Sequence, residues 1–182
     1  DFHGFTRSCF FGAKGDYDIP LLCLPSLPLS NVSRDIFCSF MGRYDTHKCR
    51  MDMKHILSPV IYNNKYQYME SSDHKTYCNI LNRSIFTLAP RGYGYTSFRI
   101  YEAICTGSIP IYIWEDKCVL PFATILDWPS FSIIIHSSQL QTLDSIIHAV
   151  DISKMQKNLN DVRHMFSFDE TYKYINNVMG EL

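Results

Sequence analysis

The chain has 182 residues, of which 46 % are hydrophobic and 19 % charged, and its formal net charge at pH 7 is −1. This composition suits one ordinary folded domain and excludes a disordered protein. The near-neutral charge argues against a nucleic-acid-binding surface, which usually carries a basic excess. No apolar run reaches the roughly 18 residues of a membrane span, so we expect none.

The first 32 residues show no regular pattern, and we expect them to be irregular. The segment Asp18 to Ser33, DIPLLCLPSLPLSNVS, carries three prolines and ends in polar residues. Prolines at this density favour extended structure over a helix or a central strand. We therefore interpret residues 1–32 as a linker and the remnant of a preceding domain.

From residue 33 onward, apolar segments of strand length alternate with helical patterns. We expect strands at 35–42, 60–62, 84–90, 108–114 and 131–136, and helices at 46–57, 72–81, 96–107, 139–150, 153–166 and in the C-terminal tail. Strands that are apolar throughout and alternate with helices indicate a parallel sheet covered on both faces. The predicted fold class is α/β, a Rossmann-like doubly wound sheet that occupies residues 33–182.

The seven cysteines show no C-x-x-C pair and no Cys/His spacing typical of a zinc site. We interpret them as small buried apolar residues, and one or two disulfides stay open as the alternative. We expect no metal site.

Polar clusters follow four of the predicted strands, at residues 42–45, 91–97, 115–117 and 136–138. In doubly wound folds, ligands bind at the carboxyl ends of the strands, so the site is expected at this edge. His136 is equally interpretable as a structural histidine, and Glu115 and Asp116 as solvated loop residues.

The cluster at 91–97 is the most informative of the four. Gly92 and Gly94 let the backbone approach a ligand closely, and Thr96 or Ser97 can cap the helix that follows. Arg99 lies in the first turn of that helix, where a cation is unfavourable by roughly 0.3–1 kcal/mol. The arrangement becomes favourable when a phosphate lies between Arg99, Arg91 and the helix N-terminus.

Glu102 lies one turn after Arg99, on the same helix face, and an acidic residue there suits ribose hydroxyls. Together a phosphate site and a ribose acceptor indicate a nucleotide. A surface ion pair between Arg99 and Glu102 is the open alternative. The third glycine of the G-x-G-x-x-G fingerprint is missing, which argues against a Rossmann oxidoreductase.

Residues 84–122, SIFTLAPRGYGYTSFRIYEAICTGSIPIYIWEDKCVLPF, and residues 126–140, LDWPSFSIIIHSSQL, resemble the exostosin-like glycosyltransferases of family 47. The matching motifs are Pro90-Arg91-Gly92, Ser97-Phe98-Arg99, Glu102-Ala103, Gly107-Ser108-Ile109-Pro110, Leu120-Pro121-Phe122 and Asp127-Trp128. GDYDIP at 15–20 is similar to the segment at the domain junction of that family, and Arg50 to its arginine after the first strand of the donor domain. The resemblance covers residues 15–166.

The resemblance implies the C-terminal half of a GT-B fold, in which the C-terminal domain holds a nucleotide-sugar, here a UDP-sugar. It implies an inverting transfer to a glycan hydroxyl that requires neither metal nor other cofactor. We expect Arg91 and Arg99 to contact the diphosphate and Glu102 the ribose. The remaining expected donor-site residues are Arg50, Gly92, Tyr95, Thr96 and Ser97.

The catalytic assignments are less direct. Glu115 or Asp116 is expected to contact the sugar, and Asp18 is the candidate general base, facing a separate acceptor domain. Asp16-Tyr17-Asp18 matches a D-x-D triplet in form but precedes the Rossmann unit. The alternative function is a non-catalytic nucleotide-sugar-binding fragment. Family members of animals and plants work in the Golgi lumen, but compartment, sugar, acceptor and linkage stay open.

Overall fold

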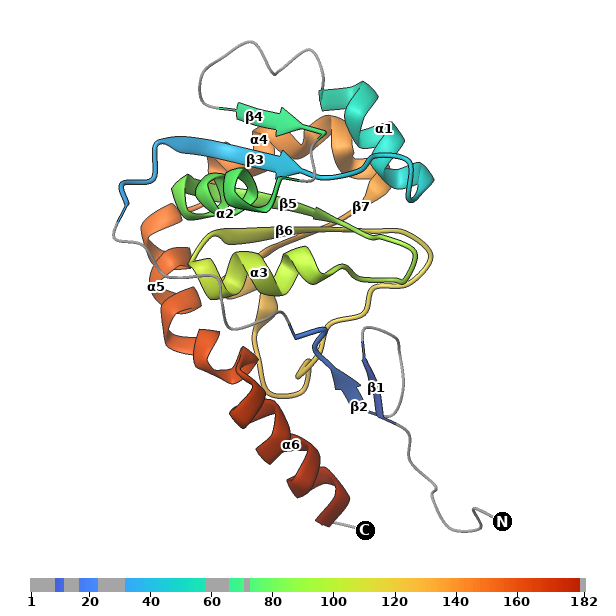
Figure 1. Ribbon diagram of the computed structural model, residues 1–182, viewed down its shortest axis with the longest axis vertical. Helices are drawn as coiled ribbons and strands as arrows, with labels where there is room; N and C mark the ends of the chain where they lie inside the picture. Colours follow the sequence, from blue (N-terminus) through green and yellow to red (C-terminus); the bar gives the residue numbers. More distant parts are fainter. Residues whose placement is uncertain (1–8, 12–16, 23–31, 58–65, 71–72, 181–182) are drawn as a thin grey trace.

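The computed structural model describes residues 9–11, 17–22, 32–57, 66–70 and 73–180. Its centre is a five-stranded sheet in the order β4-β3-β5-β6-β7 (Figure 1), in which every neighbouring pair is parallel. The strands are β3 (Ile36–Met41), β4 (Tyr66–Met69), β5 (Ser84–Pro90), β6 (Ile109–Trp114) and β7 (Ile133–His136). The predicted α/β class with a parallel sheet is confirmed.

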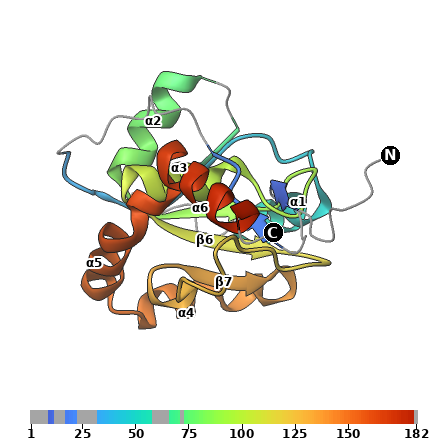
Figure 2. The same cartoon turned by 90° about the horizontal axis from the view of Figure 1, so that it is seen from below.

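Helices cover both faces of this sheet. Seen from below in Figure 2, α2 (His74–Arg83) and α3 (Phe98–Thr106) lie over one face of the sheet, and α4 (Leu143–Ala149) lies over the other. On the side of α4, α1 (Lys48–Leu57) packs against η3 (Ser137–Thr142). The chain then continues through α5 (Ile152–Val162), η4 (Arg163–Phe166) and α6 (Phe168–Gly180), and a short helix η2 (Trp128–Ser130) precedes β7.

The core lies between the sheet and these helices. Side chains on both sides of β5 and β6 are buried, with Phe86, Leu88, Ile111 and Tyr112 at 0 % exposure. Strands buried on both faces are apolar along their whole length and do not alternate with polar residues, which made β5 and β6 easy to predict from the sequence.

The two ends of α3 are built differently. Ser97 occupies the N-cap position with an extended backbone, but its side chain makes no capping hydrogen bond. Gly107 ends the helix in the left-handed conformation, with φ 77° and ψ 16°. Glycine is suited to this position because it has no Cβ to clash with the backbone. At that end Arg34 donates to the carbonyl oxygen of Thr106 at 2.5 Å.

Three expectations about secondary structure need correction or comment. The N-terminal segment is not wholly irregular, because β1 (Cys9–Phe11) and β2 (Tyr17–Ile19) pair in parallel as a small separate sheet. The edge strand β4 was not predicted, and the strand expected at 60–62 lies outside the described residues. The helix expected at 139–150 is divided into η3 and α4.

Cys38, Cys49, Cys78, Cys105 and Cys118 are free thiols. Burial raises the pKa of Cys38 and of Cys49 to about 12, so both thiols stay protonated at neutral pH. These two cysteines fit the interpretation as small buried residues, whereas Cys118 is exposed.

Candidate functional site

A cavity of about 530 Å³ lies at the carboxyl ends of β3 and β5, at the N-terminus of α3. The predicted donor-site residues in its wall come from two segments of the chain, one after β3 and one after β5. They are Arg50, Gly92, Tyr95, Thr96, Ser97 and Arg99, and the wall is completed by Leu21, Thr46, Tyr93, Gly94 and Phe98. Folding therefore brings six of the predicted site residues to one cavity.

Arg50 is buried in this wall, at 7 % exposure, and is held by backbone carbonyls rather than by a carboxylate. Its Nε donates to Arg91 O at 2.9 Å and its Nη1 to Arg43 O at 3.0 Å. Burial, and then the positive charge of Arg99, lower the pKa of Arg50 to about 10. Burial is the main cause of this shift, and the contribution of Arg99 shows that the two guanidinium groups lie close enough to repel each other.

Arg99 is the second cation of the cavity. Its Nη2 donates to Met41 O at 2.6 Å, and its guanidinium carbon lies 4.6 Å from the centroid of the Phe40 ring. Its Nε is buried without a hydrogen-bond partner. Among the described residues, neither Arg99 nor Arg50 forms an ion pair with a carboxylate.

Two hydroxyl groups in the cavity wall are also without partners in the described structure. The Oγ of Ser97 and the Oγ1 of Thr46 are buried and accept or donate no hydrogen bond there. Buried hydroxyls are usually hydrogen-bonded, so an unsatisfied pair beside two cations suits a ligand with several acceptor atoms. The first backbone N–H groups of α3 add further donors at the same place.

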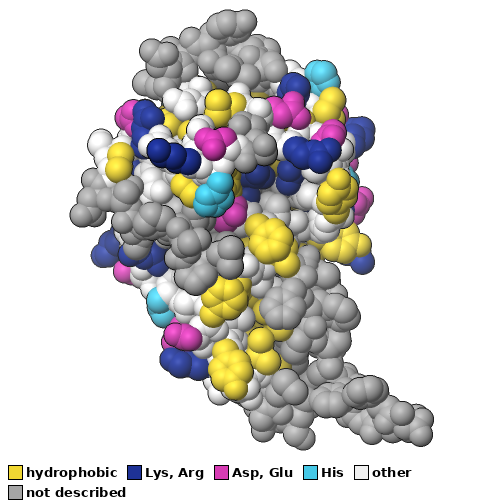
Figure 3. Space-filling view, viewed as in Figure 1, with side chains coloured by type: hydrophobic (Ala, Val, Ile, Leu, Met, Phe, Trp, Pro, Cys, Tyr) yellow, Lys and Arg dark blue, Asp and Glu magenta, His cyan; other side chains and the backbone are white. Residues whose placement is uncertain are grey.

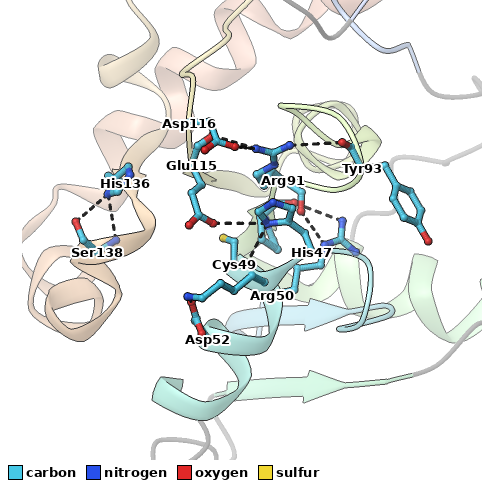
Figure 4. Close-up of polar contacts among 12 residues, drawn as sticks. His47, Cys49, Arg50, Asp52, Arg91, Tyr93, Glu115, Asp116, His136 and Ser138 are labelled. Carbon is cyan, nitrogen blue, oxygen red and sulfur yellow. Dashed lines mark hydrogen bonds and ion pairs between the residues drawn. The ribbon is translucent and has the colours of Figure 1, made fainter.

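Arg91 has partners other than the phosphate expected for it (Figure 4). Its guanidinium forms an ion pair with Asp116 and donates to the carbonyl oxygens of Glu115, at 3.2 Å, and Tyr93, at 3.4 Å. Arg91 is 6 % exposed and is not among the residues that line the cavity. In this conformation Arg91 links the loop after β6 to the backbone of Tyr93, a residue of the cavity wall.

The loop after β6 turns sharply, and Asp116 has a left-handed backbone with φ 64°. Asp tolerates this conformation better than most residues. The carboxylate of Glu115 points the other way, to His47 Nδ1 at 3.6 Å (Figure 4). The two acidic residues proposed from the sequence therefore lie on different sides of the loop.

Glu115 lines a second cavity, of about 440 Å³, between α1 and η3. His136 also lines it, but its ring accepts a hydrogen bond from Ser138 N at 3.2 Å (Figure 4). The same ring lies edge-on to Trp114. These contacts cap η3. They favour the structural interpretation of His136 that the sequence left open.

Glu102 does not line the cavity, and within the described chain it forms no ion pair with Arg99. Instead its carboxylate accepts a hydrogen bond from the hydroxyl of Tyr77 on α2. The surface ion pair left open by the sequence is therefore not formed in this conformation.

Asp18 lies in β2, and only its backbone position is described. β2 ends at Ile19, which is buried, and Leu21 lines the main cavity. Asp18 is therefore close along the chain to a residue of the cavity wall.

Sequence reasoning missed Thr46, Leu21 and Tyr77. Thr46 directly follows the polar cluster 42–45, so extending that cluster by one residue would have included it. Leu21 and Tyr77 reach the site region from the N-terminal segment and from α2, and no local motif marks either of them.

An apolar groove of about 350 Å³ adjoins the main cavity and shares Leu21 and Phe98 with it. Figure 3 shows Lys and Arg side chains in the central hollow of this face and a column of hydrophobic side chains below it. Phe98, Phe168 and Tyr172 are the exposed aromatics of this region, at 54 %, 50 % and 66 % exposure.

The described residues contain no group of three or more His, Cys, Asp or Glu side chains that could hold a metal ion. None of the helices that the structure describes is long and apolar enough to cross a membrane.

The parallel sheet with a cationic cavity at its carboxyl edge defines a Rossmann-like ligand-binding domain. Residues 15–150, more than half of the chain, match the model of the Exostosin GT47 domain. The chain belongs to this family of glycosyltransferase domains, as its motifs indicated.

Relatives among curated proteins carry names in keeping with the family. A "Probable glucuronosyltransferase" of Oryza sativa subsp. japonica is 28 % identical over 140 residues, which cover 71 % of this chain and 33 % of the relative. A "Probable glucuronoxylan glucuronosyltransferase" of Arabidopsis thaliana is 27 % identical over 148 residues, covering 75 % of this chain and 33 % of the relative. The matched region is thus about a third of the length of each relative.

Solved structures confirm the fold. The GtfA/B complex matches with a TM-score of 0.57 at 11 % identity, covering 90 % of this chain and 39 % of that one. TarM matches with a TM-score of 0.56 at 8 % identity, covering 89 % and 38 %. The chain has the architecture of one half of a GT-B glycosyltransferase.

Proposed function

We propose that the chain is the donor-binding domain of an inverting glycosyltransferase and that its main cavity binds the diphosphate of a nucleotide-sugar, most simply a UDP-sugar. One observation carries the proposal: two arginines, Arg50 and Arg99, line a cavity at a helix N-terminus, and no described carboxylate pairs with either. A diphosphate supplies the missing negative charge.

The chemistry follows from where charge develops. An acceptor hydroxyl oxygen attacks C1 of the sugar from the face opposite the diphosphate, the bond between C1 and the diphosphate oxygen breaks, and its electron pair leaves with the diphosphate. Arg50, Arg99 and the N–H groups of α3 stabilise this charge. The hydroxyl proton passes to a carboxylate, for which Asp18 stays the candidate.

In view of the observed contacts, we propose different roles for Arg91 and Glu102. Arg91 acts through its ion pair with Asp116, which holds the loop after β6 against the cavity wall. Glu102 accepts a hydrogen bond from Tyr77 and does not line the cavity, so a contact with ribose hydroxyls would require its carboxylate to leave Tyr77. The printed names of the relatives suggest a uronic acid as the transferred sugar.

The test is calorimetric titration with UDP of the wild type, Arg50→Ala and Arg99→Ala. Each substitution should weaken UDP binding at least about thirtyfold, because removing one partner of a buried charged contact costs about 2 kcal/mol or more. Arg43→Ala is the matched control, since Arg43 is exposed and, within the described part of the chain, forms an ion pair only with Asp45. Unchanged UDP affinity in both cavity variants would refute the proposal.

The guanidinium groups supply the positive charge that a divalent cation supplies in other transferases, so we also propose that UDP binding needs no metal. Chelation with EDTA should then leave the affinity unchanged. Transfer assays with a panel of glycan acceptors separate the two functions: UDP binding without transfer by this chain would favour the non-catalytic alternative. Tight binding of NAD(P) in place of UDP would instead indicate an oxidoreductase.

A further inference from the structure

Tyr77 is a side chain beside the cavity to which the function proposed above gives no role. It projects from α2 toward α3, where its hydroxyl donates to the carboxylate of Glu102. The centroid of its ring lies 5.8 Å from the guanidinium carbon of Arg99. Tyr77 thus contacts both charged residues of the R-x-x-E motif: its hydroxyl donates to Glu102, and Arg99 interacts with its ring and also with its hydroxyl.

Arg99 and Glu102 are three residues apart on one helix, a spacing at which opposite charges readily pair. In the described structure they do not, and each has other contacts. Arg99 is held by the carbonyl oxygen of Met41 and by the ring of Phe40, whereas Glu102 is held by Tyr77. The two charges are kept apart although the helix geometry would let them meet.

Tyr77 can only act as a donor to Glu102. Burial raises the pKa of the Tyr77 hydroxyl, an effect that the nearby positive charge of Arg99 opposes and the charge of Glu102 reinforces. The net pKa lies above the ordinary value, so the hydroxyl keeps its proton at neutral pH. A neutral donor satisfies the carboxylate without adding charge to the site.

We propose that Tyr77 is a positioning residue: it holds the carboxylate of Glu102 away from Arg99 and so keeps the charge of Arg99 available to a diphosphate. This rests on the proposed function, because it assumes that Arg99 binds the diphosphate. An ion pair between Arg99 and Glu102 would have to be broken by every incoming ligand, and the affinity would fall accordingly.

The test is a double-mutant cycle read out with inorganic pyrophosphate, a probe that has no ribose for Glu102 to contact. Its members are the wild type, Tyr77→Phe, Glu102→Gln and the double variant, each titrated by calorimetry. Tyr77→Phe keeps the ring over Arg99 and removes only the hydroxyl, which frees Glu102 to pair with Arg99. It should weaken pyrophosphate binding about tenfold, which corresponds to about 1.4 kcal/mol.

The double variant decides between positioning and mere structural support. Without a carboxylate to neutralise Arg99, the main cost of losing the hydroxyl disappears, so Tyr77→Phe should have a much smaller effect in the Glu102→Gln background. A structural defect would persist in both backgrounds. Equal losses in the two backgrounds, or no loss in either, would overturn the proposal.

A matched control exists elsewhere in the chain. The hydroxyl of Tyr66 donates to Asp144 at 2.6 Å, away from the residues of the main cavity. Tyr66→Phe removes the same kind of contact and should leave pyrophosphate affinity unchanged, and thermal unfolding of each variant verifies its fold. If the wild type binds neither pyrophosphate nor UDP, the proposed function fails as well. If Arg99→Ala weakens binding but Tyr77→Phe does not, only the role of Tyr77 fails.

Discussion

The two ends of α3 each have an arginine, and the two arginines differ in kind. At the C-terminus, Arg34 donates to the carbonyl oxygens of Thr106 and Ser84, both at 2.5 Å. At the N-terminus, Arg99 lies in the first turn with one backbone acceptor and a buried, unpartnered Nε. Elementary electrostatics favours a cation at the C-terminal end of a helix and opposes one at the N-terminal end.

The difference separates a structural charge from a functional one. Arg34 donates to carbonyl groups at the C-terminal ends of α2 and α3, so its place is explained by the fold alone. Arg99 lies in the wall of a cavity and close to a second cation, Arg50, and it has no carboxylate partner among the described residues. Under the proposed function, an anionic ligand in the cavity accounts for the position of Arg99.

The largest expected effect contrasts the two arginines directly. Arg34→Ala should lower the free energy of unfolding by about 2 kcal/mol, because several carbonyls lose a charged donor. Its UDP affinity should match the wild type at temperatures where both are folded. Arg99→Ala should show the reverse, with a stability change below about 1 kcal/mol and a large loss of affinity. Urea unfolding and UDP titration measure the stability and the UDP affinity of both variants. Similar changes of stability and of affinity in the two variants would contradict the distinction between a structural and a ligand-binding arginine.

Each arginine has a glycine beside it, which gives a smaller version of the same test. Gly42 has φ +146°, and a Cβ there would lie 2.4 Å from Nη2 of Arg99. Gly107 has φ +77°, and its Cβ would lie 3.0 Å from Nη2 of Arg34.

Both Gly42→Ala and Gly107→Ala should lower the free energy of unfolding by roughly 1–3 kcal/mol through backbone strain. Only Gly42→Ala should also displace Arg99, and it should weaken UDP binding by about tenfold. Equal UDP affinities in the two folded variants would show that the position of Arg99 does not matter for binding.

The smallest expected effect is a pH dependence. Because the pKa of Arg50 is lowered to about 10, its charge is lost at a pH where ordinary arginines keep theirs. UDP affinity should therefore be constant from pH 7 to about 9 and fall as the pH rises through 10. For this group alone, stability should change in the opposite direction, since the unfolded chain then binds more protons than the folded one.

Titration of the wild type and of Arg50→Met between pH 7 and about pH 10.5 checks this dependence. The variant should bind weakly throughout, and the part of the decline caused by Arg50 should be absent from it. Parallel curves for the two proteins would assign the decline to another group.

The sequence predicted the parallel sheet well because β5 and β6 are buried on both faces and are apolar along their whole length. It missed β4, an edge strand of four residues whose burial falls from buried Tyr66 to exposed Met69 without an alternating pattern. It also missed the pairing of β1 with β2, since three-residue strands leave almost no periodic signal.

For the site, spacing along one segment was enough to gather residues 92–99, because a strand, a turn and a helix start fix their positions locally. The hydrogen-bond and ion-pair partners of long side chains could not be predicted from local spacing. Arg91 pairs with Asp116, which is 25 positions away, and Glu102 bonds to Tyr77 on another helix. Such choices depend on the packing of whole elements, which the local sequence does not contain.

The most direct test of the central claim is a crystal structure of the chain with UDP bound. The account predicts that the diphosphate lies in the cavity at the N-terminus of α3, with its oxygens within hydrogen-bond distance of both Arg50 and Arg99 and near Ser97. A diphosphate bound elsewhere, such as in the cavity lined by Glu115 and His136, with Arg50 and Arg99 uncontacted, would contradict it.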